Sequence, residues 1–416
     1  YKDVVAPAAA TALGWSYTSP SNTLTQILTW TASVSPDLER ENIEYFNDAT
    51  CGTQWNYDGL QSSPKTKVFS GDGNWTFRIH SRDTAGNEAS SSCSSVMVVD
   101  TAAPTGESIS IAGGATYATS TSVTLTLSAT GASQMYVTNT AGCGSGGSWE
   151  TYATSKAWTL GQTNGTATVY VKYRDAATNE STCVSDTIVH DNVLPTVAIT
   201  SPAANSYINV ANVAAVTLSG TCSESGRNVV LSGAISATIT CTGGNTWSQS
   251  IDFSSAAQGT ITVNANHDDA AGNAATQSSR SFIKDTNNPA ITLGAPFFSG
   301  GHVVMVGAAK TVSWSGTSDV GTGIASISVE YFNSSSAWTT VASGETNDGS
   351  YTWTIPNDVH AAARIRLRIY DVAGNSETDT GLPFTIVPAV TAPTSLSWTQ
   401  TSPNPAAALT ANWTKN

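Results

Sequence analysis

One five-residue phrase, Asp-x-Ala-Gly-Asn or a near relative, constrains the fold of this chain more than any other feature. It occurs four times, with steps of 92, 94 and 102 residues, at 83–87, 175–179, 269–273 and 371–375. A second phrase, an Asp with a Pro four residues later, repeats with the same period at 3–7, 100–104, 191–195 and 285–289. Two phrases that share one period indicate an array of homologous modules. We therefore predict four modules, at 4–100, 101–191, 192–285 and 286–388.

The last residues repeat the first. Trp398 and Trp413 have the same spacing as Trp15 and Trp30, and both pairs flank a Thr-Ser-Pro sequence. We therefore expect 389–416 to be the opening strands of a fifth, truncated module, and the chain to be a segment of a longer protein.

Module two shows the strand pattern most clearly. Apolar residues alternate with hydroxyl residues in short runs separated by Gly, Ser, Asn and Thr, at 121–127, 134–138, 158–160, 167–174 and 183–190. Such alternation predicts half-buried strands, and no helical period is present. About seven short strands in ~90–100 residues are typical of an immunoglobulin-like (Ig-like) sandwich. The predicted fold class is all-β, with tandem Ig-like β-sandwiches arranged as an elongated array.

Charge excludes several classes of partner. Only 11% of the residues are Asp, Glu, Lys or Arg, and the net charge is −13. Nucleic acid and anionic lipid both require clustered Lys and Arg, so neither is expected as a partner. No apolar run approaches the ~20 residues that span a bilayer, so we expect no membrane insertion within this segment. An acidic chain is compatible with divalent cations.

The six cysteines fall two to a module in the first three modules. Their spacing is not that of a zinc site. We expect three disulfides within modules, and hence an oxidising compartment, either the periplasm or the outside of a cell. The expected pairs are Cys51 with Cys93, Cys143 with Cys183, and Cys222 with Cys241.

The order strand, Asp-x-Ala-Gly-Asn, strand, Asp-x-x-x-Pro resembles the bacterial Ig-like and fibronectin-III-like tandem repeats of large, adhesin-type cell-surface proteins. The resemblance covers essentially the whole chain, and Glu44-Tyr-Phe-Asn47 recurs as Glu330-Tyr-Phe-Asn333 in the Ig-like or fibronectin-III-like module four. It implies a non-enzymatic stalk, spacer or adhesive segment at the bacterial surface, associated with the outer membrane. A cell-surface protein or glycan, and neighbouring modules of the same chain, are the implied partners. The alternative is a set of glycan- or protein-binding accessory modules of a secreted hydrolase.

The repeated Asp residues have two interpretations. In the first, each Asp caps its turn, Gly supplies the positive φ, and no ligand is involved; Thr178 replaces this Gly in module two, so its turn should differ. In the second, linker and turn residues bind Ca²⁺ at the module junctions, because the turn after the sixth strand lies at the end where the chain enters a sandwich. The junction residues are then Asp3 with Asp83, Asp100 with Asp175 and Asn179, Asp191 with Asp269 and Asn273, and Asp285 with Asp371 and Asn375.

Other residues also allow two interpretations. Trp55, Trp149 and Trp338 follow the third strand and could stack on sugars or pack in the usual way, whereas the alternation around Trp30, Trp314 and Trp413 indicates core positions. Arg364, Arg366 and Arg368 alternate with aliphatic residues, as in a docking stripe for an acidic partner or in a solvated face. We expect no enzyme, because no known catalytic motif is present and the five histidines lie in strands or linkers without a partnered Cys or Ser in reach by sequence.

Overall fold

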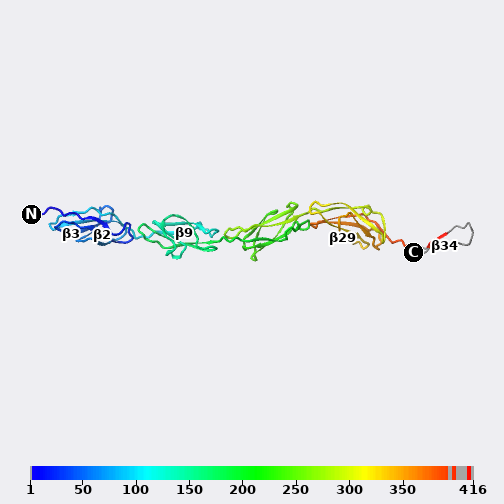
Figure 1. Cartoon of the computed structure of the whole chain (residues 1–416), viewed down its shortest axis with the longest axis horizontal. Coiled ribbons are helices and arrows are strands. Elements are labelled where there is room, and N and C mark those ends of the chain that lie inside the picture. The colour runs from blue at the N-terminus through cyan, green and yellow to red at the C-terminus, as the bar shows by residue number, and fades with distance from the viewer. Residues whose placement is uncertain (1, 392–395, 400–409, 414–416) are drawn as a thin grey trace. The chain divides into compact units, whose positions relative to one another are not determined.

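The computed structural model describes residues 2–391, 396–399 and 410–413. Within these residues the chain is built from strands, and its helical segments are two 3-10 turns, η1 (Ala112–Gly114) and η2 (Ala141–Cys143). Strands follow one another along the whole colour ramp of Figure 1. The all-β prediction is confirmed. No helix in the part of the chain that the structure describes is long and apolar enough to cross a membrane.

The chain divides into two compact units, each of which holds two hydrophobic cores. The first unit comprises Tyr1–Val193 with Ala271–Asn273, and the second comprises Leu194–Ala270 and Ala274–Asn416. The four cores draw their buried residues from 10–99, 111–188, 199–282 and 291–386. Each core thus lies inside one predicted module, while the boundaries between modules stay a prediction.

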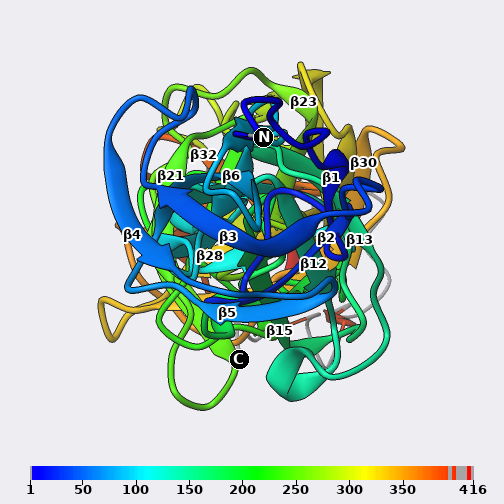
Figure 2. The ribbon, with the colours of Figure 1, turned by 90° about the vertical axis from the view of Figure 1, so that its left-hand side faces the viewer.

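Module one pairs its strands into two antiparallel sheets. One sheet has the order β1-β2-β5, and the other has the order β4-β3-β6-β7 with β8 also on β6. Figure 2 looks toward this module, with β3 and β6 near each other. Its strands are β1 (Thr11–Trp15), β2 (Thr25–Thr31), β3 (Leu38–Phe46), β4 (Gln54–Asp58), β5 (Lys65–Val68), β6 (Gly73–Asp83), β7 (Glu88–Ser90) and β8 (Met97–Val99).

Module two has the strand order of an Ig-like sandwich. A three-stranded sheet, β14-β11-β9, faces a five-stranded sheet, β10-β16-β15-β12-β13, in which β10 runs parallel to β16. Its strands are β9 (Thr105–Ile111), β10 (Tyr117–Ala118), β11 (Ser122–Thr130), β12 (Gln134–Thr138), β13 (Trp149–Thr151), β14 (Ser155–Thr159), β15 (Gly165–Arg174) and β16 (Val184–His190).

Module three repeats this order as β17-β19-β22 and β18-β24-β23-β20-β21. The two sheets of module three therefore match those of module two strand for strand. Its strands are β17 (Val197–Ser201), β18 (Tyr207–Ile208), β19 (Val216–Cys222), β20 (Asn228–Gly233), β21 (Ala237–Thr240), β22 (Thr246–Ile251), β23 (Gly259–His267) and β24 (Ser278–Lys284).

Module four has sheets β25-β27-β30 and β29-β28-β31-β32, with β26 paired in parallel to β33. Its strands are β25 (Ala290–Leu293), β26 (Val303–Met305), β27 (Ala309–Ser318), β28 (Ile324–Phe332), β29 (Trp338–Glu345), β30 (Ser350–Thr354), β31 (Arg364–Asp371), β32 (Ser376–Thr380) and β33 (Thr385–Val387). Beyond it, β34 (Leu396–Thr399) and β35 (Thr410–Trp413) form an antiparallel pair. The rest of the predicted fifth module lies outside the described residues.

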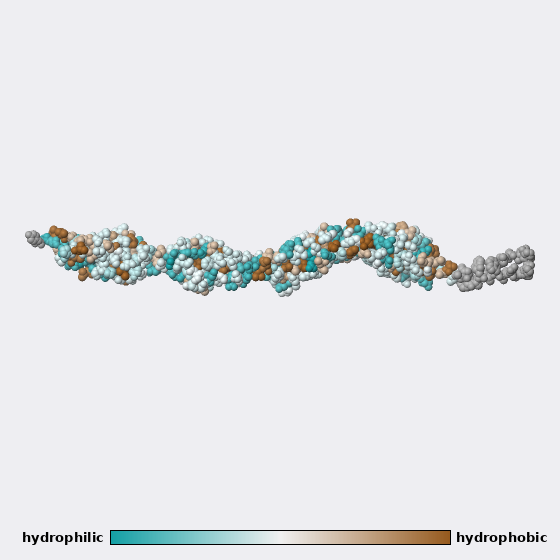
Figure 3. Space-filling model, in the orientation of Figure 1, coloured by the Kyte–Doolittle hydropathy of each residue, from teal (hydrophilic) through white to brown (hydrophobic). Residues whose placement is uncertain are grey.

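Alternation along the strands places the core. In β11 every second residue is buried, so Val123, Leu125 and Leu127 face the core and the hydroxyl residues between them face solvent. The visible face in Figure 3 is accordingly pale over most of its area, with apolar residues scattered among near-neutral ones. The hydroxyl-rich composition is therefore a property of the outer sheet faces.

Three disulfides, each within one module, link the cysteines. Cys51 is bonded to Cys93, Cys143 to Cys183 and Cys222 to Cys241, and no described cysteine is free. Each bond joins segments that are distant in sequence, so each restricts the unfolded chain.

Candidate functional site

The repeated turn has the same internal geometry wherever its hydrogen bonds are described. In module one the Asp83 carboxylate accepts bonds from the backbone N–H and the side-chain amide of Asn87, both at 2.8 Å. Asp175 with Asn179 and Asp371 with Asn375 repeat both bonds. The Asp therefore caps the turn, as the first interpretation requires.

Module two keeps this turn although it lacks the glycine. Thr178 has a φ of 73°, in the same left-handed region as Gly86 at 92° and Gly374 at 91°. The expectation that this turn would differ is wrong. The two carboxylate bonds to Asn179 hold the backbone in a conformation that a β-branched residue rarely adopts.

The Asn of each phrase has a second role, which is to hold the linker. Its amide Nδ2 donates to the carbonyl of the linker Asp that immediately precedes the same module. The bonds are Asn87 to Asp3 (3.5 Å), Asn179 to Asp100 (2.7 Å), Asn273 to Asp191 (3.0 Å) and Asn375 to Asp285 (2.9 Å). The two phrases therefore share a period because they are in contact.

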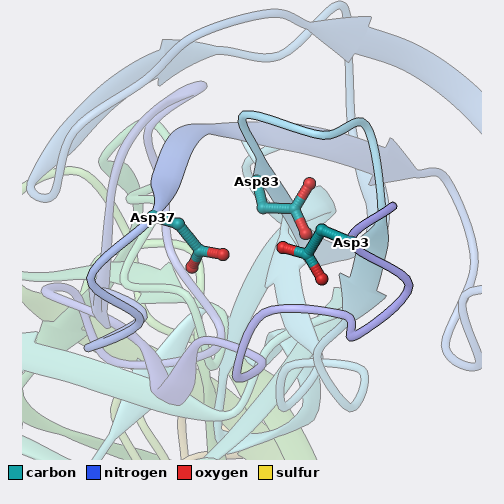
Figure 4. Close-up of side chains that lie close together, drawn as sticks. All are labelled: Asp3, Asp37 and Asp83. Carbon is teal, nitrogen blue, oxygen red and sulfur yellow. The ribbon is translucent and has the colours of Figure 1, made fainter. Parts of the chain in front are cut away.

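Module one gathers three carboxylates at this place. Oxygens of Asp3, Asp37 and Asp83 lie within 4.8 Å of one another. Figure 4 shows the three side chains converging from the N-terminal linker, the loop before β3 and the end of β6. Asp83 is fully buried, and Asp3 is exposed.

Asp83 is held as a carboxylate. Its burial raises the pKa, but hydrogen bonds from the Asn87 side chain and from the backbone of Asn87, Ala85 and Gly86 outweigh burial, so the pKa of Asp83 lies below its ordinary value. At neutral pH the cluster therefore contains a buried negative charge beside two further carboxylates.

Module four builds an equivalent cluster from Asp285, Asp319 and Asp371, whose oxygens also lie within 4.8 Å of one another. Asp285 and Asp371 are buried. Asp319 accepts a bond from Gly323 N–H through Oδ2, while its buried Oδ1 has no hydrogen-bond partner. A Cβ on Gly321 would lie 2.2 Å from Asp285 Oδ2, so only glycine leaves room for that carboxylate.

The repeated turn of module four is also held from module three. Asn209 donates to the Ala373 carbonyl at 2.8 Å, and the N–H of Val210 donates to Asn375 Oδ1 at 2.8 Å. A loop of the preceding module therefore packs on the turn that carries Asp371.

In modules two and three the described residues include no such three-carboxylate group. The linker residues Asp100 and Asp191 accept bonds from backbone N–H groups two residues on, in Ala102 and Val193. In module three Arg227 donates to the Asp269 carbonyl at 2.7 Å. The predicted junction residues of these modules thus meet through hydrogen bonds.

Sequence reasoning missed the third carboxylate of each cluster. Asp37 and Asp319 precede the strand that carries Glu-Tyr-Phe-Asn, in the two modules that share this phrase. That shared phrase was the available signal. The equivalent loop of module two holds Gly131 and Ala132, and that of module three holds Glu224, which joins no such cluster among the described residues.

The tryptophans and arginines largely pack within their modules. Trp30 and Trp314 are core residues, 6% and 5% exposed, while the side chain of Trp413 lies outside the described residues. The guanidinium groups of Arg174 and Arg366 lie 4.3 and 4.1 Å from the ring centres of Trp149 and Trp338, and Trp55 packs on Trp75 at 4.9 Å. Each of the three sugar-stacking candidates therefore has a ring neighbour or cation of its own module against it.

The arginine stripe is partly neutralised. Arg366 forms an ion pair with Glu330, and Arg368 lies 3.7 Å from the other oxygen of that carboxylate. Arg364 is exposed. This arrangement matches a solvated face more closely than a docking stripe.

One histidine has partners that the sequence did not indicate. His80 lies 2.8 Å from Ser90 Oγ and 2.9 Å from Glu44 Oε2, because β3, β6 and β7 are neighbours in one sheet. Glu44 also lies 4.0 Å from Arg78. Acyl transfer would further require donors placed around the developing oxyanion, so this row of side chains does not define a catalytic site.

The sheets and the cores define this chain as a tandem series of Ig-like β-sandwiches with acidic clusters at the start of two modules. No protein-family model and no curated protein sequence matches it. Among solved structures it is similar to a Ca²⁺-stabilised adhesin with which an Antarctic bacterium reaches out and binds ice. The identity is 19%, the match covers 87% of this chain and 94% of that one, and the TM-score is 0.37.

Two further structures are similar. One belongs to a 1.5-MDa bacterial ice-binding adhesin, at 17% identity, with 68% and 99% of the two chains covered and a TM-score of 0.33. The other comprises the fibronectin(III)-like modules of Clostridium thermocellum CbhA, at 16% identity, with 46% and 95% covered and a TM-score of 0.33. At these scores the fold assignment rests on the strand order of this chain itself.

Proposed function

We propose that this chain is a non-enzymatic, extracellular repeat segment of a bacterial cell-surface protein. It acts as a stalk or spacer with an adhesive surface, and Ca²⁺ stiffens the linkers of modules one and four. The observation that carries the proposal is the origin of the carboxylates: in each cluster one comes from the linker and two come from the module that follows.

The residues at these places fit a calcium ion. Ca²⁺ takes six to eight oxygen ligands at about 2.3–2.6 Å, and three carboxylates supply up to six. A cation would explain two features of module four. Asp319 Oδ1 is buried without a hydrogen-bond partner, and Gly321 leaves space beside Asp285. Asp285, Asp319 and Asp371 would hold the ion in module four, and Asp3, Asp37 and Asp83 would hold it in module one.

A bound cation would join the linker to its module. Negative charges at so short a distance repel one another. A divalent cation between them would replace this repulsion with attraction. The hydrogen bonds from the Asn side chains already hold the linker backbone in one position, so a bound ion would stiffen the linker further. In modules two and three we propose that Asp100, Asp175, Asn179, Asp191, Asp269 and Asn273 hold the linker mainly by hydrogen bonds, with weaker affinity for Ca²⁺.

Other features support display outside the cell. Three disulfides persist only in an oxidising compartment. Attachment at the outer membrane, and a cell-surface protein or glycan as partner, belong to the same proposal. No observation in the described residues favours accessory modules of a hydrolase.

The test is calorimetry of the intact chain in millimolar Ca²⁺ and in chelator. Binding to the folded state alone raises the melting temperature by mass action. We expect a higher melting temperature in Ca²⁺ than in chelator. In Ca²⁺, amide exchange should also be slower at 285–289 and 319–323 than at 100–104. Equal melting and equal exchange in the two buffers would show that the carboxylates act only as turn caps.

A further inference from the structure

Module four has a hollow of about 470 Å³ between the edge strand β30 and the strands β28 and β29 of the opposite sheet. Aromatic and polar side chains share its lining. The residues that matter here are Tyr331, Tyr351, Trp353, Asn333, Thr339 and Asp358.

The aromatic part is rigid. The rings of Tyr331 and Trp353 lie 5.1 Å apart, and Trp353 is only 4% exposed. Both rings are buried and fixed, and the half-buried Tyr351 is the aromatic side chain of the lining that stays open to a ligand.

The polar part is also oriented in advance. Asp358 Oδ2 accepts bonds from the Tyr331 hydroxyl at 2.6 Å and from Ser334 N–H at 3.0 Å. Hydrogen bonds from Ser334 and Tyr331 lower the pKa of Asp358, so it is ionised at neutral pH. Its Oδ1 has no hydrogen-bond partner among the described residues. Thr339 Oγ1 accepts a bond from Asn333 and keeps its own proton available.

Module one provides an internal comparison, because Tyr45 and Tyr331 occupy the same place in the repeated Glu-Tyr-Phe-Asn phrase. There the Tyr45 hydroxyl donates to Asp58, and Lys67 Nζ lies 3.1 Å from the same carboxylate and 4.2 Å from the Tyr45 ring centre. Lys67 comes from β5, which pairs with β2 as β30 pairs with β27. A lysine thus covers the ring and the carboxylate in module one, whereas in module four His360 lies 3.7 Å from Asp358 Oδ2 and its ring centre lies 5.9 Å from that of Tyr331.

We propose that the hollow of module four binds an uncharged oligosaccharide segment. A sugar ring presents C–H groups that pack on aromatic faces and hydroxyls that pair with a carboxylate and a threonine. The Asp358 carboxylate would repel acidic sugars. The inference rests on the adhesive part of the proposed function and gives it a ligand class, and it is independent of calcium.

The experiment uses the full chain on an array of neutral and acidic oligosaccharides, followed by saturation-transfer NMR with each neutral hexasaccharide that binds. We expect binding to neutral glycans and none to sialylated or uronic ones. Asp358→Asn keeps the shape and an acceptor for Tyr331 but loses the charge, so affinity should fall about tenfold. Tyr351→Ala should also weaken binding.

Asp348→Asn is the matched control, because Asp348 is an exposed carboxylate of the same module outside this lining. It should leave binding unchanged. Binding of acidic glycans only, equal binding by Asp358→Asn and the parent, or no neutral glycan bound at millimolar concentration overturns the proposal. Melting temperatures in Ca²⁺ and in chelator show whether a variant is folded and test the stalk proposal separately.

Discussion

Asp319→Asn should change stability in opposite directions with and without calcium. In chelator the parent chain holds three carboxylates whose oxygens lie within 4.8 Å of one another, and two unit charges at this distance repel by roughly 3.5 kcal/mol at an effective dielectric constant of about 20. Asparagine removes two of these repulsive pairs. Its Oδ1 can still accept the bond from Gly323 N–H, so the loop geometry is retained.

Solvent reaches Asp319, so the full repulsion will not be recovered. We expect a gain of about 1–2 kcal/mol in chelator, which for a domain of this size corresponds to a rise in melting temperature of roughly 5–10 °C. In Ca²⁺ the parent should gain about 4 kcal/mol when the free ion is a thousandfold above its Kd. The variant lacks one ligand, so it should melt below the parent in that buffer.

The assay is calorimetry of both proteins in both buffers, with hydrogen exchange at 285–323 to assign the transition to module four. Asp252→Asn in module three is the control: Asp252 accepts a bond from Ser254 N–H and belongs to no carboxylate cluster among the described residues, so any loss should be equal in the two buffers. A change of the same sign in both buffers for Asp319→Asn would refute the argument, because the carboxylate would then act only as a loop acceptor.

Three other outcomes follow from the same structure. Hydrogen bonds from the backbone of Thr53, Thr50 and Gly52 lower the pKa of Asp48 to about 2. The contribution of this carboxylate to stability is therefore present above pH ~4 and lost as the pH falls toward 2. The melting temperatures of the parent and of Asp48→Asn should converge over this range, and a constant difference between them would contradict the prediction. Replacing Cys222 and Cys241 together by Ser opens a disulfide with a sequence separation of 19 and should cost about 3 kcal/mol in urea unfolding; an unchanged midpoint would mean that the unfolded state is not restricted by this bond. Small-angle scattering should give a maximum dimension well above that of a compact 42.9 kDa sphere, since the sequence predicts an elongated array, and a compact particle would rule that array out.

Much of the fold could be predicted because its signals are local. The alternation at 121–127, 134–138 and 167–174 became β11, β12 and β15 within a few residues. The short edge strands β10 and β13 were not predicted, because two or three residues carry too little alternation to distinguish a strand from a loop. The strand predicted at 158–160 begins earlier in the structure: β14 covers Ser155–Thr159, where the half-buried Lys156 and the exposed Ala157 interrupt the apolar alternation.

By itself the sequence determined the module period, the sandwich class, the two-per-module distribution of cysteines and the capped turn, since each depends on residue types at fixed short spacings. Only the tertiary structure decided which distant side chains meet. Asp37 and Asp319 join their clusters because a loop between strands folds over the linker, and the Glu-Tyr-Phe-Asn phrase of the following strands marks the two modules as alike without showing that contact. The same applies to Lys67, which covers the Tyr45 ring in module one, whereas His360 lies beside the Tyr331 ring in module four. Equivalent positions of the modules carry a lysine over the tyrosine ring, a cluster of carboxylates or an open hollow. Which of these forms depends on partners some ten to ninety residues away in sequence, and a sequence pattern does not show which of those residues meet in space.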